Sequence, residues 1–191
     1  VKCSSIQTGV FSGEVGSAIG QHKFNPNCVV REKQNASNTY LPQYGFFEIR
    51  AKSLDAQSNV VALWMIGFED SPEKSAEICI FEVKGSNVLK NKAKIGYGIH
   101  KFNDPDIKEA FYEDVFEIDV TQFHVYSAEW TPEKVIFYID NQKIREIKQS
   151  PSYPMQFMLG IYEIPIEIVA KKDKIYPKNF VIDYVRGYKH E

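Results

Sequence analysis

The stretch SAEICIFEVKG, residues 75–85, places two glutamates in an otherwise apolar run, with a cysteine between them. Glu77 and Cys79 are two residues apart and share one side of a β-strand, whereas Glu82 is five residues from Glu77 and points to the opposite side. A β-bulge of one extra residue would bring all three side chains onto a single face. The candidates for that residue are Ile80 and Phe81. In a helix, residues 77 and 82 would lie about 140° apart, so the pattern favours a bulged strand.

Apolar and polar residues alternate with period two in many short segments, which are separated by turn residues and are typical of β-strands. The clearest are YGFFEIRAK (44–52), NVVALWMIGF (59–68), AEICIFEV (76–83), KIGYGIHKF (94–102), FHVYSAEW (123–130), KVIFYIDNQKIREI (134–147), MQFMLGIYEI (155–164) and FVIDYVRGY (180–188). The DNQK within residues 134–147 predicts a hairpin turn. No window predicts a long helix, and residues 104–114 are either a helical turn or two or a loop.

Many short strands in one chain predict an all-β fold of two stacked antiparallel sheets, a sandwich of the jelly-roll, concanavalin A-like kind. A length of 191 residues suits one domain, so residues 1–191 are expected to form a single domain. In residues 94–100, Gly96, Gly98 and His100 share the face opposite the apolar residues. Because glycine removes bulk and lets a ligand approach the backbone, one sheet is expected to carry an open cleft on its concave face.

The composition favours an uncharged partner. Lys plus Arg total 23 and Asp plus Glu total 25, so the net charge of -2 provides no electrostatic attraction to nucleic acid or to an anionic membrane. No apolar run approaches the about 18 residues that a membrane helix needs. The three cysteines have no metal-ligand spacing, so no metal or cofactor is required, and a Cys3–Cys28 disulfide stays an open question. We expect a monomer.

Two carboxyl groups that face one groove suit the cleavage of a glycosidic bond. One carboxylate attacks the sugar or activates water, and the other carboxyl group protonates the departing oxygen. Cleavage with retention needs carboxyl groups about 5 to 5.5 Å apart, whereas inversion needs about 6.5 to 9.5 Å. From the pattern alone, Glu77 and Glu82 could equally be solvated residues on an exposed face.

The order of YGFFEIRAK, ALWMIGF, AEICIFEVKG, GYGIH, FHVYSAEWTPEKVIFYIDNQ, PMQFMLGIYE and VIDYVRGY resembles glycoside hydrolase family 16, from about residue 43 to residue 188. The bulged signature of that family is Glu, any residue, Asp, two residues, Glu. The resemblance implies a jelly-roll, retaining endo-glycosidase that cleaves a β-glucan of 1,3 or mixed 1,3/1,4 linkage. It implies Glu77 as the nucleophile and Glu82 as the general acid and then base. The Asp that holds and tunes the nucleophile is replaced here by Cys79.

The resemblance also implies residues that contact the sugar. Trp64 and Trp130 match aromatic platforms, and the other expected cleft residues are Glu48, Arg50, His100 and Tyr162. Without the resemblance, the tryptophans could equally be core residues, Glu48 and Arg50 an exposed ion pair, and the histidine half-buried. Asp183 matches a position that can help bind a structural calcium ion, whose other ligands the sequence does not reveal.

A second hypothesis is a lectin-like domain that binds polysaccharide without efficient turnover. Cys79 supports it, and so does Gly160, which stands where relatives commonly have an asparagine. The presence of both glutamates argues against it, because a binding domain needs neither a nucleophile nor a proton donor. Transglycosylation is a third outcome, which nothing in the sequence distinguishes from hydrolysis. The expected location, secreted or periplasmic, follows from where such polymers occur.

Overall fold

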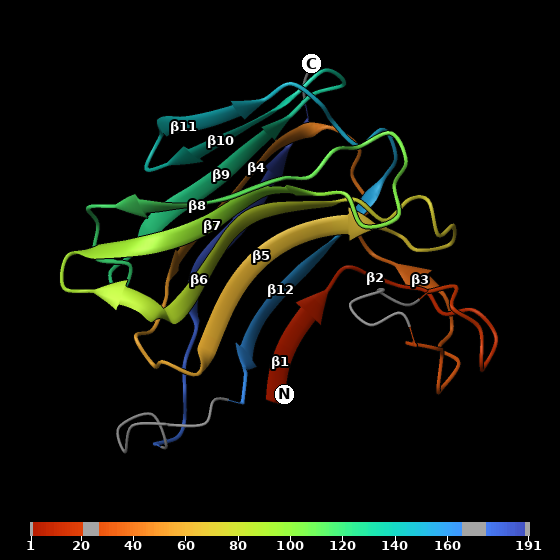
Figure 1. Ribbon diagram of the computed structural model, residues 1–191, viewed down its shortest axis with the longest axis horizontal. Coiled ribbons are helices and arrows are strands. Elements are labelled where there is room, and N and C mark those ends of the chain that lie inside the picture. Colours follow the sequence, from red (N-terminus) through yellow and green to blue (C-terminus); the bar gives the residue numbers. More distant parts are fainter. Residues whose placement is uncertain (1, 21–26, 166–174, 190–191) are drawn as a thin grey trace.

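The computed structural model describes residues 2–20, 27–165 and 175–189, which form strands and loops without a helix (Figure 1). Among these residues, no helix is long and apolar enough to cross a membrane. The larger sheet has six strands in the order β1 (Lys2–Gln7), β12 (Met155–Glu163), β5 (Asn59–Gly67), β6 (Glu77–Leu89), β7 (Lys92–His100) and β8 (Ala110–Phe116). The second sheet has five strands, β11 (Gln142–Ile147), β10 (Val135–Ile139), β9 (His124–Trp130), β4 (Gly45–Lys52) and β13 (Val181–Tyr188). A short pair joins β2 (Gly9–Val10) to β3 (Ser37–Asn38).

The prediction of an all-β antiparallel sandwich is confirmed, and every predicted strand is present within two residues of its expected bounds, except that β6 continues to Leu89, six residues beyond its expected end. The hairpin turn between β10 and β11 lies at Asp140 and Asn141, whose φ angles of 49° and 64° are typical of a two-residue turn. Four strands were not predicted, namely β1, β2, β3 and β8. Of the segment expected to be a helical turn or a loop, residues 104–109 are a loop and the following residues form β8.

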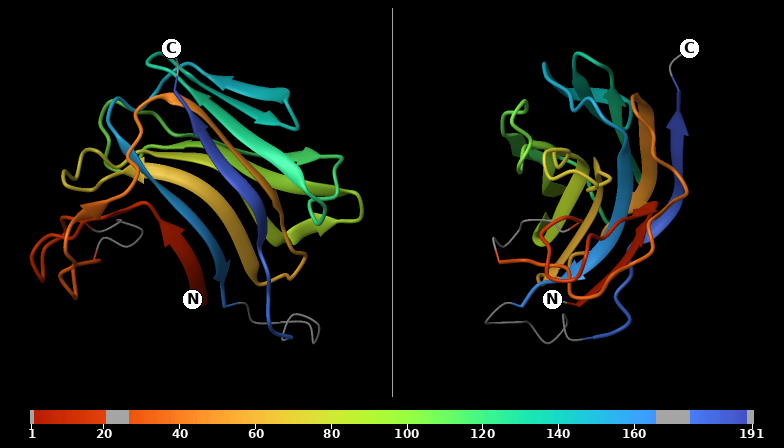
Figure 2. Two further views of the ribbon diagram at one scale, coloured as in Figure 1. Left: turned by 180° about the vertical axis from the view of Figure 1, so that it is seen from behind. Right: turned by 90° about the vertical axis from the view of Figure 1, so that its right-hand side faces the viewer.

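The six-stranded sheet lies in front of the five-stranded sheet in Figure 1, and both sheets are curved. In the right-hand view of Figure 2, β12, β4 and β13 bow in the same sense. The outer face of the six-stranded sheet is therefore concave, and the outer face of the five-stranded sheet is convex. Any side chain of β5, β6, β7 or β12 that points away from the core lies on the concave face.

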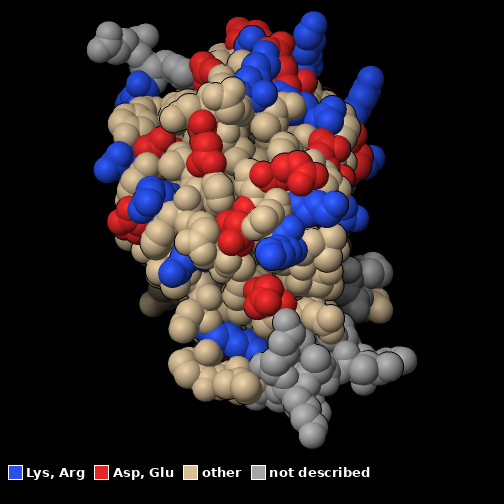
Figure 3. All heavy atoms as spheres, turned by 90° about the vertical axis from the view of Figure 1, so that its left-hand side faces the viewer, with Lys and Arg blue, Asp and Glu red and all other residues tan. Residues whose placement is uncertain are grey.

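Charged side chains lie on the surface, where both signs are interspersed on the side at the β6–β7 turn (Figure 3). Among the described residues, the buried acidic residues are Asp104 and Glu77. The Asp104 carboxylate accepts hydrogen bonds from the Tyr153 hydroxyl at 2.7 Å and from the Asp106 backbone N–H at 2.9 Å. No described residue hydrogen-bonds to the Glu77 carboxylate. A buried carboxyl group without such a partner destabilises the fold, and its position therefore suggests a functional role.

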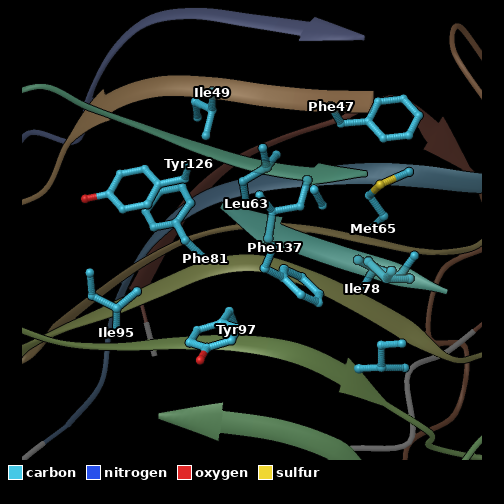
Figure 4. Close-up of a cluster of buried hydrophobic side chains, with 14 of the residues drawn as sticks. Phe47, Ile49, Leu63, Met65, Ile78, Phe81, Ile95, Tyr97, Tyr126 and Phe137 are labelled. Carbon is cyan, nitrogen blue, oxygen red and sulfur yellow. The ribbon is translucent and has the colours of Figure 1, made fainter. Parts of the chain in front are cut away.

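The core lies between the two sheets and is lined by the inward residues of each strand (Figure 4). Phe47, Ile49 and Ala51 of β4 are buried, as their alternation predicts. Phe81 of β6 stacks on Tyr126 of β9 with ring centroids 4.3 Å apart, which ties one sheet to the other. Truncation of a buried aromatic of this kind costs about 3–5 kcal/mol.

A polar cluster joins the two sheets at the edge formed by β7, β8 and β11. Arg145 donates from Nε to the Tyr97 hydroxyl at 3.0 Å and from Nη2 to the Asp114 carboxylate at 2.9 Å. The Tyr97 hydroxyl in turn donates to Asp114. Since Arg145 belongs to the five-stranded sheet and its two partners to the six-stranded sheet, the cluster fixes the separation of the sheets at this edge.

We predict that Arg145→Met lowers the free energy of unfolding by about 1–3 kcal/mol, because the buried Tyr97 hydroxyl and the Asp114 carboxylate lose a charged partner. Urea unfolding measures this loss. Lys143→Met, which removes an exposed ion pair with Glu146, is the control and should change stability by less than about 0.5 kcal/mol. Equal effects of the two substitutions would contradict the role of the cluster.

Candidate active site

The predicted bulge is present in β6. On the β7 side, Cys79 pairs with Gly98 and Glu82 with Gly96, so two residues of β6 lie opposite one residue of β7. Those two residues, Ile80 and Phe81, are both buried in the core between the sheets. Glu77, Cys79 and Glu82 therefore all emerge on the concave face.

Glu77 lies at the start of β6, with Ile66 of β5 and His100 of β7 as its cross-strand neighbours. The residue is only 8% exposed. Burial, followed by repulsion from Glu82 and Glu109, raises the pKa of Glu77 from the ordinary value of 4.5 to about 8. The buried position therefore favours the protonated form of this carboxyl group.

Glu82 is more open, with 28% of its side chain exposed, and it has a cationic neighbour. The Lys84 ammonium lies 3.4 Å from a Glu82 carboxylate oxygen. Lys84 also donates to Glu113 of β8 at 2.8 Å, and Lys94 of β7 lies 3.1 Å from the other Glu113 oxygen. The four side chains form one charged row along β6, β7 and β8.

Cys79 lies on the same face between the two glutamates. It pairs with Trp64 across β5, belongs to a small cluster with Ala62 and Ile66 that is separate from the main core, and is 1% exposed. Burial, and then the charges of Glu77 and Glu82, raises the pKa of the thiol well above its ordinary value. The thiol is therefore neutral, which makes it a poor nucleophile and a weak hydrogen-bond partner.

Two aromatic side chains border this cluster from β5 and β12. The Trp64 indole N–H hydrogen-bonds to the Tyr162 hydroxyl, and burial raises the pKa of Tyr162. The Tyr162 ring lies over Gly160, where an added Cβ would come within 2.7 Å of the hydroxyl oxygen. Glycine at position 160 therefore makes room for the aromatic side chain of Tyr162.

His100 is held on the concave face by two contacts. Its Nδ1 lies 2.6 Å from a Glu109 oxygen, and its ring stacks on Phe111 with centroids 4.2 Å apart. The structure also corrects the expectation that the glycines of β7 leave space for a ligand. A Cβ on Gly96 would lie 2.6 Å from the Phe111 ring, and one on Gly98 would lie 2.3 Å from a β8 carbonyl oxygen. The space at both positions is filled by β8.

Three residues that the resemblance assigned to the cleft lie elsewhere, so that part of the prediction is wrong. Glu48 and Arg50 lie on the convex face, because β4 belongs to the five-stranded sheet and its core-facing residues point the other way. Glu48 is 3.6 Å from the Arg186 guanidinium. Trp130 is fully buried, and its indole N–H donates to the Ser150 hydroxyl at 2.7 Å. It is a core residue.

Asp183 also lies on β13 of the convex sheet. Its carboxylate accepts a hydrogen bond from Arg50 at 2.6 Å. Within the described ranges, no group of three His, Cys, Asp or Glu side chains could hold a metal ion. The Asp183 carboxylate is thus paired with a guanidinium, and the structural calcium ion stays a prediction, since backbone carbonyl ligands are not part of such a side-chain group.

Sequence reasoning missed several residues around the pair. Glu109, Phe111 and Glu113 lie on or beside β8, which the sequence did not predict. The position of Lys84 beside Glu82 could have been predicted, because Lys84 is two residues after Glu82 on the same strand and so shares its face. Cys3, which lies on the unpredicted strand β1, is exposed, and neither Cys3 nor Cys28 forms a disulfide.

Comparison with known proteins places this geometry among carbohydrate-active proteins. The family described as Glycosyl hydrolases family 16 matches residues 30–186. Endo-1,3-1,4-beta-glycanase ExsH of Rhizobium meliloti is 25% identical over 79% of this chain and 31% of its own length. Probable xyloglucan endotransglucosylase/hydrolase protein 28 of Arabidopsis thaliana is 31% identical over 67% of this chain and 40% of its own. The chain thus spans under half of these relatives.

Solved structures give the same fold. A GlcNAcα1-4Gal-releasing endo-β-galactosidase from Clostridium perfringens superposes with a TM-score of 0.76 and 28% identity, covering 98% of this chain and 47% of its own. The laminarinase catalytic domain from Thermotoga maritima has a TM-score of 0.62 and 24% identity, covering 80% of this chain and 66% of its own. The second similarity shows the sandwich fold alone.

The raised pKa of Glu77 predicts a pH-dependent stability. Between about pH 4.5 and pH 8 the folded chain binds a proton on Glu77 that the unfolded chain has lost, so stability falls as pH rises through this range. Glu77→Gln removes the ionisable group, so the stability of this variant should not fall in this way as pH rises. The variant should melt at a higher temperature than the wild type at pH 8.5, and at a similar temperature at pH 4.5.

Glu133→Gln at an exposed position is the matched control and should follow the wild type at both pH values. Thermal unfolding followed by circular dichroism gives the comparison. If the Glu77→Gln and wild-type melting temperatures differ by the same amount at both pH values, Glu77 is not a buried carboxyl group that resists ionisation.

Proposed function

Since this chain belongs to the glycosyl hydrolases family 16, we propose that it is a retaining endo-β-glycosidase that cleaves internal bonds of a polysaccharide. One observation carries the proposal: the bulge in β6 presents Glu77 and Glu82 on the same concave face, beside Trp64. Burial, and then the charge of Glu82, raises the pKa of Glu77, so the two carboxyl groups interact. Retention requires about 5 to 5.5 Å.

In the proposed mechanism, the ionised Glu77 carboxylate attacks the anomeric carbon, and the bond from that carbon to the leaving sugar oxygen breaks. Glu82 donates its proton to the leaving oxygen. In the second step, Glu82 takes a proton from water, the water oxygen attacks the anomeric carbon, and the bond to Glu77 breaks. Lys84 beside Glu82 stabilises the carboxylate form that Glu82 has between the two steps.

We propose a β-1,3- or mixed β-1,3/1,4-glucan as the substrate. An uncharged sugar chain suits the apolar side chains of Trp64, Met158 and Phe111 around the pair. Similarity to the Rhizobium 1,3-1,4-β-glycanase supports this linkage, and similarity to the Clostridium endo-β-galactosidase supports a β-galactan as the alternative. The chain is proposed to act as a monomer on polymers outside the cytoplasm.

A second candidate function is polysaccharide binding without efficient turnover. The neutral thiol of Cys79 and the lack of a hydrogen bond from any described residue to Glu77 favour it, because an unsupported, protonated carboxyl group is a poor nucleophile. Laminarin, lichenan, xyloglucan and agarose separate the two functions when binding and new reducing ends are both measured. Binding without products after long incubation would favour the binding domain.

For the enzyme, we predict that Glu77→Gln abolishes the release of oligosaccharides, since an amide cannot form the glycosyl ester. Glu82→Gln should reduce the rate on polymer on the order of 10²- to 10⁴-fold, because the leaving oxygen loses its proton donor. Glu48→Gln on the convex face is the matched control and should retain activity. Unchanged hydrolysis by Glu77→Gln would exclude Glu77 as the nucleophile.

Cys79→Asp tests whether position 79 tunes the nucleophile. An added carboxylate would repel the ionised form of Glu77, while an added carboxylic acid could share a proton with it. Both effects change the activity or its pH dependence, so the pH–rate curve of the variant should differ from that of the wild type. Superimposable curves would mean that the thiol only fills space under Trp64.

A further inference from the structure

A cavity of about 510 Å³ lies at the edge of the sandwich, where β1 begins beside the end of β12 (Figure 1). Tyr162 of β12 lies on the concave face with Trp64, and Cys3 is its cross-strand partner on β1. The next pair along the two strands, Lys2 and Glu163, therefore points to the inner side of the sheet. The cavity lies on that inner side, so it is separate from the proposed catalytic cleft.

Four side chains form an ionic cluster in this cavity. The Lys178 ammonium donates to Glu163 Oε1 at 2.7 Å and to the Ser58 hydroxyl at 3.2 Å. The Tyr176 hydroxyl donates to the other Glu163 oxygen at 2.6 Å, and the Lys2 ammonium donates to the Tyr176 hydroxyl at 3.2 Å. The hydrogen bonds from Lys178 and then Tyr176 lower the pKa of Glu163 to about 2, so Glu163 is a carboxylate at neutral pH.

The cluster carries an excess of positive charge. Among the described residues that line the cavity, Lys2 and Lys178 are the cations and Glu163 is the acidic residue, so two positive charges and one negative charge leave a net charge of +1. The Lys178 side chain is only 7% exposed, so water solvates its ammonium group poorly. The cavity therefore favours a ligand with an anionic group.

The other lining residues suit a sugar ring. The Tyr176 ring is largely exposed and lies beside Pro177 and Ile161, and such surfaces pack against the apolar CH faces of sugars. Asn59 also lines the cavity. Its Nδ2 donates to the Tyr162 backbone oxygen at 3.2 Å, whereas its buried Oδ1 accepts no hydrogen bond from the described residues. A ligand hydroxyl supplies the kind of donor that Oδ1 lacks.

We propose that this cavity binds a sugar ring that carries a carboxylate, such as a uronic acid unit of an acidic glycan. The carboxylate pairs with Lys2 and with the third ammonium hydrogen of Lys178, which the bonds to Glu163 and Ser58 leave available. The ring packs on Tyr176. The volume lies within the range of about 300–1,000 Å³ that is usual for small-molecule sites.

This inference goes beyond the proposed function, which places an uncharged glucan in the concave cleft. A second, charge-selective site on the inner side of β1 and β12 gives the chain an additional contact with polysaccharides that contain uronic acid units. The site can be tested without any measurement of hydrolysis, because it shares no residue with the proposed catalytic pair.

Sodium glucuronate is the probe, with glucose and sodium acetate as the controls, and each is titrated into the ¹⁵N-labelled chain. Glucuronate should shift the backbone amide signals of Ser4, Glu163 and Lys178 and should bind about tenfold more tightly than glucose or acetate. Equal affinity for acetate would indicate a simple anion site, and equal affinity for glucose would exclude recognition of the carboxylate. Either result, or shifts confined to Trp64 and Glu77, would overturn the proposal.

Substitutions at the cavity identify the groups that bind the probe. Lys2→Met removes an ammonium group on a mostly exposed side chain and should weaken glucuronate binding about tenfold, whereas Lys2→Arg keeps the cation and should retain binding. Tyr176→Ala removes the ring and should also weaken binding. Lys90→Met removes a charge at a distant exposed position and is the matched control.

Thermal unfolding of each variant shows whether the fold is intact. Lys2→Met and Tyr176→Ala variants that stay folded and bind glucuronate as the wild type does would overturn the proposal. Equal weakening by Lys90→Met would also overturn it, because the effect would then follow from the net charge of the chain.

Discussion

One extra residue in β6 determines which side chains lie together on the concave face. With Ile80 and Phe81 both directed into the core, Glu82 follows Glu77 and Cys79 onto the outer face. In a regular strand Glu82 would point into the core, where an unpaired carboxylate is strongly unfavourable. The hydrophobic core therefore enforces the bulge, and Phe81 stacked on Tyr126 holds it in place. The shared face of Glu77 and Glu82 is thus a consequence of core packing.

The sequence predicted the features that depend on the alternation of side chains along a single strand. Five residues between two glutamates require a bulge if both are to share a face, and period-two alternation located the strands. Alternation shows which residues of a strand avoid the core, but it does not show which sheet receives that strand. Glu48 and Arg50 were correctly expected to lie opposite Phe47 and Ile49, yet β4 belongs to the sheet whose outer face is convex.

The residues that surround the pair were harder to predict because they depend on tertiary contacts. Phe111 and Glu113 reach the site only because β8 pairs with β7, and the sequence AFYEDVF of β8 lacks a regular alternation of apolar and polar residues. Trp130 was expected to line the cleft but is buried in the core, because it packs against Tyr44 and Phe47 of a neighbouring segment. The protonation of Glu77 depends on burial and on Glu109, neither of which can be inferred from spacing.

The proposed nucleophile, Glu77, is a buried carboxyl group that packs beside the neutral thiol of Cys79. An activated 2-deoxy-2-fluoro β-glycoside tests this assignment directly, because it forms the glycosyl–enzyme ester and slows its hydrolysis. Peptide mapping by mass spectrometry should then find the fluorosugar on Glu77. Attachment to Glu82 or Cys79, or unlabelled protein that still turns over the reagent, would contradict the account.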